Sequence, residues 1–182
     1  RASHVVVWAN IDPTQGKAGI KSFVVPKGLP GVQLVRLEKK MGIRASDTAV
    51  ITFTDCRVPA EDLPGSPEID TKSGFAGAMA TFDASRPIVA AMAVGVGRAA
   101  LDFLVEELER QGVVIRYDSP PRAQTALERD VIDMQAELQA ARLLTWRAAS
   151  MMNRGRPNSL EASMAKAKAG LVVTKITQKA VE

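Results

Sequence analysis

Cysteine and histidine are nearly absent from the 182-residue sequence, in which Cys56 and His4 are the only residues of their kinds. One cysteine excludes an internal disulfide framework, and one cysteine with one histidine cannot supply the four ligands of a structural zinc site. We therefore expect no metal site and a reducing compartment, the cytoplasm. Cys56 is interpreted as a small buried filler and His4 as a partly exposed structural residue.

Long apolar runs and blocks of like charge are also lacking. No apolar run approaches the roughly 20 residues that span a bilayer, and the N-terminus has no signal-peptide pattern, so we expect no membrane span. The net charge is +4 and basic residues are interleaved with acidic ones, so nucleic acid is not an expected partner. The composition that remains, 46% hydrophobic and 24% charged residues, is that of a folded globular protein.

The sequence has neither an initiator methionine nor a clear stop signal at its end. It opens on Arg1 and ends at Glu182 inside a helical pattern. Its length suits one domain or two incomplete ones.

The first sixty or so residues have the composition of β-strands. Four runs rich in β-branched residues alternate with turn-forming segments, and they cover residues 4–9, 20–25, 32–37 and 48–53. The connection 26–31 contains prolines and glycines that neither a helix nor a central strand could carry. Short strands with brief links predict an antiparallel meander or barrel.

From Gly74 onward the apolar spacing becomes helical, with steps of mostly three and four residues. The first stripe comprises Phe75, Met79, Phe82, Ala90, Ala93, Val94, Gly97, Leu101, Leu104 and Leu108. Small residues are dense at 90–100 and again at 162–170, which we interpret as tight packing between helix backbones. The glycines within 90–100 follow no strand, so they do not form a phosphate-binding loop.

A second helix is predicted over about 123–153, with Gly155 and Pro157 as its stop signals. Asn158 or Ser159 is expected to cap a third helix. Long helices joined by short connections predict an antiparallel bundle. The stripe of the second helix comprises Leu127, Val131, Met134, Leu138, Ala141, Leu144 and Trp146, and its expected exposed residues are Glu128, Asp133 and Arg142.

Several motifs in a fixed order resemble one known family. They are KMGIRASDT at 40–48, ITFTDCRVP at 51–59, GF at 74–75, FDASRP at 82–87, AAMAVG at 90–95, DM at 133–134, AAR at 140–142 and EASMAK at 161–166. Together they resemble the acyl-CoA dehydrogenase family over essentially the whole chain. By itself, the segment 40–48 is interpreted as a structural corner, in which Gly42 permits a tight turn.

The resemblance implies an α+β fold in two parts. Residues 1–68 would be the second part of an antiparallel β-barrel domain, and residues 69–182 an antiparallel helical domain of the four-helix-bundle type that lacks its last helix. The family's N-terminal helical domain and its flavin-binding strands would then lie upstream of Arg1. The implied cofactor is FAD, and the implied partners are an acyl-CoA substrate, an electron-transfer flavoprotein and further subunits of a homo- or hetero-oligomer.

The segment FDASRP, residues 82–87, contains the side chains best suited to bind a ligand. Asp83 and Arg86 are three residues apart and can pair on one helix face, while Pro87 removes a helix donor and frees the carbonyl group of Asp83. A kinked core helix would account for these residues without any ligand. The resemblance implies a substrate site instead: Phe82 and Ser85 would flank the acyl chain and thioester, and Asp83 and Arg86 would hold the pantetheine arm of CoA.

Family members need a glutamate that removes the α-proton of the substrate. Some members carry it immediately before the arginine of this helix, where this sequence has Ser85, which cannot act as a carboxylate base. We assign no catalytic residue within the chain and expect the base beyond Glu182.

The resemblance implies that Arg110 and Gln124 reach a flavin held by a neighbouring subunit. Arg110 matches the first residue of the family's Arg-x-x-Phe-Gly motif, but the Phe and Gly are not matched and the following loop is longer. A surface role would explain Arg110 as well.

Three functions follow. The favoured one is an FAD-dependent acyl-CoA dehydrogenase of lipid catabolism that forms a trans-2-enoyl-CoA. The alternatives are a non-catalytic subunit of a heteromeric dehydrogenase and an acyl-CoA oxidase. We expect the 182-residue chain alone to be inactive.

Overall fold

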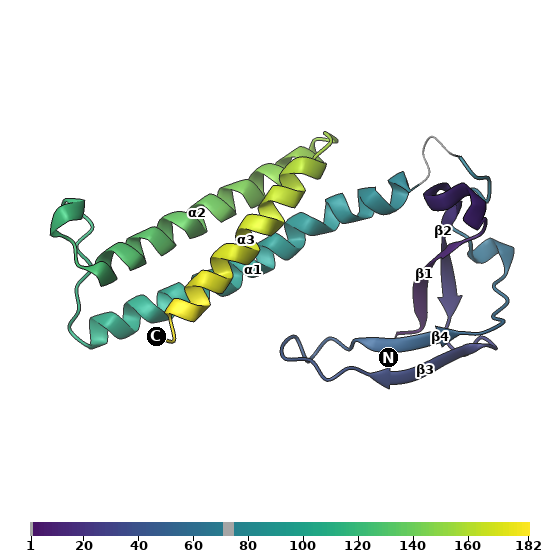
Figure 1. Cartoon of the computed structure of the whole chain (residues 1–182), viewed down its shortest axis with the longest axis horizontal. Helices are drawn as coiled ribbons and strands as arrows, with labels where there is room; N and C mark the ends of the chain where they lie inside the picture. Colours follow the sequence, from purple (N-terminus) through teal and green to yellow (C-terminus); the bar gives the residue numbers. More distant parts are fainter. Residues whose placement is uncertain (1, 71–74) are drawn as a thin grey trace. The chain divides into compact units, whose positions relative to one another are not determined.

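The computed structural model describes residues 2–70 and 75–182, and the chain divides into two compact units, Arg1–Gly77 and Ala78–Glu182. Figure 1 shows strands in the first unit and helices in the second. The domain boundary predicted after residue 68 lies in the connection ahead of the first long helix. Gly74, where the helical period was predicted to begin, lies outside the described residues.

Four strands form in the first unit, each within one residue of the predicted range: β1 (His4–Asn10), β2 (Ile20–Pro26), β3 (Val32–Leu37) and β4 (Ala49–Phe53). β1 pairs antiparallel with β2, and β3 pairs antiparallel with β4. A 3-10 segment, η1 (Pro13–Gly19), joins β1 to β2, and a second, η2 (Ala60–Asp62), follows β4.

The two hairpins form two separate sheets in the described residues. Antiparallel pairing was predicted, but the break between β2 and β3 was not. The segment that joins them, 26–31, contains Pro26 and Pro30, which have no backbone N–H to donate, and Gly28 and Gly31, which adopt positive φ angles of 87° and 88°.

The second unit contains three long helices: α1 (Ala76–Arg110), α2 (Ala126–Asn153) and α3 (Ser159–Lys179). A short 3-10 turn, η3 (Pro121–Ala123), precedes α2 and delays its start by three residues relative to the prediction. Thr125 then begins α2 with a reciprocal capping box to Glu128. The predicted stop of α2 is confirmed, because Gly155 has φ 65° and the Arg156 N–H reaches the Met151 carbonyl group at 2.9 Å.

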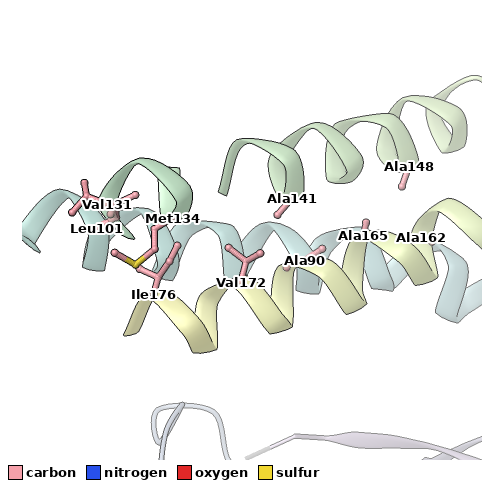
Figure 2. Packing of buried hydrophobic residues seen from close by; sticks show 11 residues of the cluster. Ala90, Leu101, Val131, Met134, Ala141, Ala148, Ala162, Ala165, Val172 and Ile176 are labelled. Carbon is pink, nitrogen blue, oxygen red and sulfur yellow. The ribbon is translucent and has the colours of Figure 1, made fainter. Parts of the chain in front are cut away.

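Alanine forms most of the buried contact between the helices. Figure 2 shows Ala141 and Ala148 of α2 on the side that faces Ala162 and Ala165 of α3, and all four are completely buried. This confirms the tight packing predicted for 162–170, since short side chains allow close backbone approach. Larger side chains fill the far end of the core, where Val131, Met134, Val172 and Ile176 are buried with Leu101 of α1.

The other stretch of small residues, 90–100 in α1, packs against neighbouring helices only in part. Gly97 is buried, and a Cβ atom there would lie 3.1 Å from Cδ1 of Leu138. Gly95 is exposed, with open space where its Cβ would be. The interpretation of 90–100 as a packing segment therefore holds for one face of α1 alone.

Several predicted burials were wrong. Glu128, expected on the exposed face, is only 2% exposed. Trp146, expected in the apolar stripe, is 57% exposed, because it follows Leu144 by two positions and such residues point to different sides of a helix. Leu127 is also exposed. Phe75 precedes α1 and packs edge-on against Trp8 of β1, with ring centroids 6.2 Å apart.

The two scarce residue types lie in the first unit. Cys56 is half-buried, not a fully buried filler, and His4 is exposed, with Nδ1 3.0 Å from the Ser3 hydroxyl group. Within residues 2–70 and 75–182, no cluster of three potential metal ligands occurs.

One helix among the described residues, α1, is long and apolar enough to cross a membrane by length and composition. No uninterrupted apolar run of that length occurs in α1, because Arg98 and Asp102 interrupt it, but alanine and valine raise the mean hydropathy to 1.9 over 18 residues. Core helices of globular proteins pass the same test, so this is weak support for a span.

Candidate functional site

Phe82, Asp83 and Arg86 lie together near the beginning of α1. The guanidinium Nη1 of Arg86 is 2.6 Å from Oδ1 of Asp83, and both side chains are about one-fifth exposed. The Arg86 guanidinium carbon lies 5.7 Å from the centre of the Phe82 ring, within the range of a cation–π contact. The ion pair that the spacing predicts is present, and it is braced by an aromatic ring.

Ser85 is turned toward its own helix. Its hydroxyl group donates to the Phe82 carbonyl oxygen at 3.3 Å, as serine commonly does inside helices. The carboxylate of Asp83 is held by Arg86. We refer to Phe82, Asp83, Ser85 and Arg86 as the α1 tetrad. It contains donors, an acceptor and an aromatic surface, which are binding groups, but no carboxylate free of an ion pair.

Pro87 is buried directly after the tetrad and has no N–H with which to bond the carbonyl group of Asp83. The Nδ2 of Asn158 lies 3.4 Å from that carbonyl oxygen and donates to it. The same nitrogen donates to the carbonyl oxygen of Ala148 at 3.1 Å. Asn158 was predicted as a possible helix cap, and it does occupy the residue before α3, but its side chain makes no capping bond there.

Arg110 ends α1, far from the tetrad. At a rise of about 1.5 Å per residue, Arg86 and Arg110 are roughly 36 Å apart along the helix. The side chain of Arg110 is 63% exposed, and its Nη1 contacts Oε2 of Glu107 at 2.5 Å. A guanidinium group has five donors and binds phosphate well, so Arg110 fits a flavin diphosphate while it keeps the contact with Glu107.

Gln124 lies in the loop before α2 and is half-buried. Its Nε2 donates to the carbonyl oxygen of Ser119 at 3.0 Å. A side-chain amide has two N–H donors, so the residue can hold the loop and still offer the second one. The predicted cofactor residues thus lie at the two ends of one loop.

That loop is closed by a buried carboxylate that sequence reasoning missed. Arg116 contacts Glu128 through Nε at 2.7 Å and Nη2 at 2.8 Å. The hydrogen bond from Arg116 and a second from the backbone N–H of Thr125 hold the pKa of Glu128 well below its usual range. The capping-box spacing of Thr125 and Glu128 was the available signal, since such a glutamate turns back toward the chain.

The segment 40–48 closes on itself. The Nζ of Lys40 bonds the Ser46 carbonyl group, and Nε of Arg44 donates to the Lys40 carbonyl group at 3.0 Å. The left-handed residue is Ile43, with φ 51°, and not Gly42. These local hydrogen bonds hold the chain in a turn, which agrees with the interpretation of this segment as a structural corner.

A groove of about 820 Å³ runs between α1 and α2, beyond the tetrad. Its polar lining includes the Arg98–Asp102 ion pair and Arg142, whose guanidinium carbon lies 4.5 Å from the centre of the Trp146 ring. None of the predicted site residues lines it.

These features define a two-part chain in which antiparallel strands precede a helical domain that carries a polar tetrad. The family described as "Acyl-CoA dehydrogenase, C-terminal domain" matches residues 72–182. The chain therefore belongs to the acyl-CoA dehydrogenase family.

Known proteins resemble this chain over its full length. The sequence is 40% identical over 181 residues to "Short-chain specific acyl-CoA dehydrogenase, mitochondrial" of Bos taurus, which covers all of this chain and 42% of the relative. The solved butyryl-CoA dehydrogenase of Megasphaera elsdenii is 34% identical, with a TM-score of 0.84 over 99% of this chain and 45% of its own. A chain from a structure described as the electron transferring flavoprotein of Acidaminococcus fermentans is 37% identical, with a TM-score of 0.84 over 100% of this chain and 46% of its own. The chain thus spans less than half the length of these relatives.

Proposed function

We propose that the protein containing this chain is an FAD-dependent dehydrogenase that converts an acyl-CoA thioester to a trans-2-enoyl-CoA. The observation that carries the proposal is the α1 tetrad, in which a partly exposed ion pair, Asp83–Arg86, is held against Phe82 in a member of the acyl-CoA dehydrogenase family. Relatives named for short-chain substrates support a short acyl chain.

The tetrad suits the pantetheine arm of CoA. That arm contains amide groups, each with one N–H donor and one carbonyl acceptor. Arg86 donates and the carboxylate of Asp83 accepts, so the pair offers both complements to an amide. Phe82 gives the acyl chain an apolar surface, and Ser85 can turn its hydroxyl group from the helix carbonyl toward the thioester.

The chemical step needs two groups besides the tetrad. A carboxylate removes the α-proton, and we propose a glutamate beyond Glu182 for this role, since Ser85 cannot serve. The bound flavin supplies the acceptor for the hydride that leaves the β-carbon.

Arg110 and Gln124 are the residues we propose to hold the flavin. The roughly 36 Å along α1 between Arg86 and Arg110 supports a cofactor contact made to another subunit and not to the substrate site of the same chain. Reoxidation by an electron-transfer flavoprotein and a cytoplasmic location complete the proposal, and the single, half-buried Cys56 supports a reducing compartment.

The decisive experiment uses the full-length protein. Purified holoenzyme is assayed with butyryl-CoA, with electron-transfer flavoprotein as acceptor, and hydrogen peroxide is measured in parallel. We expect enoyl-CoA formation that depends on the acceptor. Peroxide release without the acceptor would favour the oxidase alternative instead.

Substrate binding is tested separately with Arg86→Ala. We expect the dissociation constant for acyl-CoA to rise at least several-fold, because Asp83 is then left without its cation. Unchanged binding would sink the assignment of the tetrad.

A non-catalytic subunit is the second candidate, and one observation favours it. α1 ends at Arg110, and Val113 and Val114 stand where the family's Arg-x-x-Phe-Gly motif has Phe and Gly, so the loop departs from the motif where it would approach a flavin. A full-length chain that purifies colourless and becomes yellow only with a partner chain would support this candidate.

A further inference from the structure

The carbonyl group of Asp83 has lost its normal partner. In an α-helix it would accept the N–H of the residue four positions later, which is Pro87. Pro87 is buried, so water is a poor substitute at this point of the helix. The Nδ2 of Asn158, at 3.4 Å, supplies the donor from a position 75 residues further along the chain.

Asn158 is suited to this role and to little else. It is 6% exposed, and its side chain does not cap the helix that it precedes. Its Nδ2 instead donates to carbonyl groups of the other two helices, Asp83 of α1 and Ala148 of α2. Two N–H donors on one nitrogen are required for both bonds, which serine, threonine and aspartate do not have.

We propose that Asn158 is a positioning residue for substrate binding, whose amide group replaces the helix hydrogen bond that Pro87 cannot make. The replaced bond closes the turn from which the side chains of Asp83 and Arg86 both project, so Asn158 fixes the backbone beneath that ion pair. This inference rests on the proposed function, in which the same pair holds the CoA arm.

This role can be tested specifically, because the hydrogen bond from Asn158 to the Asp83 carbonyl group should become unnecessary in Pro87→Ala. Alanine restores the N–H that bonds the Asp83 carbonyl group, whereas the bond from Asn158 to Ala148 is unaffected. In the wild-type background, Asn158→Ala should raise the acyl-CoA dissociation constant about three- to tenfold, an effect no larger than the worth of the one hydrogen bond that holds the turn beneath the ion pair. In the Pro87→Ala background, the same substitution should change it less than about twofold.

The measurement is acyl-CoA binding to full-length holoenzyme for wild type, both single variants and the double variant, with butyryl-CoA as probe. Thr145→Val is the matched control: it removes a buried hydroxyl group that bonds the Ala141 carbonyl group at 2.8 Å in the same core. We expect this control to lower the melting temperature and to leave acyl-CoA binding unchanged.

Two results would overturn the inference about Asn158 alone. One is unchanged binding in Asn158→Ala while Arg86→Ala weakens binding. The other is an equal loss with and without Pro87, which would indicate general support of the core. If Asn158→Ala does not fold by itself, the comparison is made in the Pro87→Ala background, where binding within about twofold of the Pro87→Ala single variant supports the inference and a larger loss overturns it. Wild-type protein that binds no acyl-CoA would reject the proposed function, and this inference with it.

Discussion

Arg116 and Glu128 meet at two points, with Nε 2.7 Å from one carboxylate oxygen and Nη2 2.8 Å from the other. The same carboxylate accepts the backbone N–H of Thr125 at 2.6 Å. The side chain of Glu128 is 3% exposed, whereas that of Arg116 is half exposed. A single buried carboxylate therefore ties the loop that follows α1 to the first turn of α2.

This arrangement predicts a specific acid sensitivity. The pKa of Glu128 is lowered on folding, so the unfolded chain takes up a proton, near its ordinary pKa of about 4.3, that the folded chain does not. The stability contributed by Glu128 is therefore fully present above about pH 5 and declines as the pH falls below it. Glu128→Gln should lower the melting temperature at pH 7 and flatten its decline between pH 5 and pH 3.

The check is thermal unfolding of full-length protein across that pH range. Glu106→Gln, which alters an exposed glutamate of α1, is the control and should reproduce the wild-type curve. Parallel curves for wild type and Glu128→Gln would contradict the prediction.

The end of α2 should be sensitive to one methyl group. Gly155 has φ 65°, and its surroundings leave open space for a Cβ atom, so Gly155→Ala carries only the conformational cost of a left-handed residue. We expect a loss of about 1–2 kcal/mol in unfolding free energy. Gly170→Ala within α3, also in open space, should instead gain up to about 1 kcal/mol. Urea unfolding distinguishes the two, and a neutral Gly155→Ala would refute the role of the turn.

Two glycines of α1 should respond in opposite directions to added bulk. A Cβ atom at Gly97 would lie within 3.7 Å of Leu138, Val173 and Ile176, so Gly97→Leu should cost about 1–3 kcal/mol by overpacking. Gly95→Ala meets nothing within 4 Å and should stabilise the helix by about 0.5–1 kcal/mol. Unfolding measurements on both variants test the assignment of the packed face, and equal effects would contradict it.

Arg110→Ala should weaken flavin retention and spare substrate binding. The measurements are the FAD content of the purified full-length protein by absorbance and the acyl-CoA dissociation constant of reconstituted enzyme. Glu107→Gln is the control, because it removes only the carboxylate that contacts Arg110 and should leave FAD content at the wild-type value. Normal FAD content in Arg110→Ala would assign that residue to the surface.

Features set by neighbouring residues were predictable from the sequence. Strand limits follow from runs of β-branched residues and from turn residues, and the end of α2 follows from Gly155. The pairing of Asp83 with Arg86 follows from their spacing. Each of these features depends on residues within a few positions of one another, so the local sequence is enough to predict it.

Features that depend on distant residues were missed. The unpaired carbonyl group of Asp83 could be deduced from Pro87, but its donor, Asn158, lies 75 residues away and could not be identified from spacing. Glu128 was placed on the exposed face because periodicity does not show that Arg116, twelve residues earlier, folds over it. Trp146 was assigned to the core on hydrophobicity, although its angle on the helix places it outside.

The length of α1 has a genetic consequence. If Arg86 of one chain and Arg110 of another serve the same active centre, neither single variant can form a complete centre by itself. Oligomers that mix Arg86→Ala chains with Arg110→Ala chains would contain some centres with both arginines intact and others with neither. Two defective alleles expressed in one cell should therefore complement each other in part, whereas two alleles altered at the same end of the helix should not.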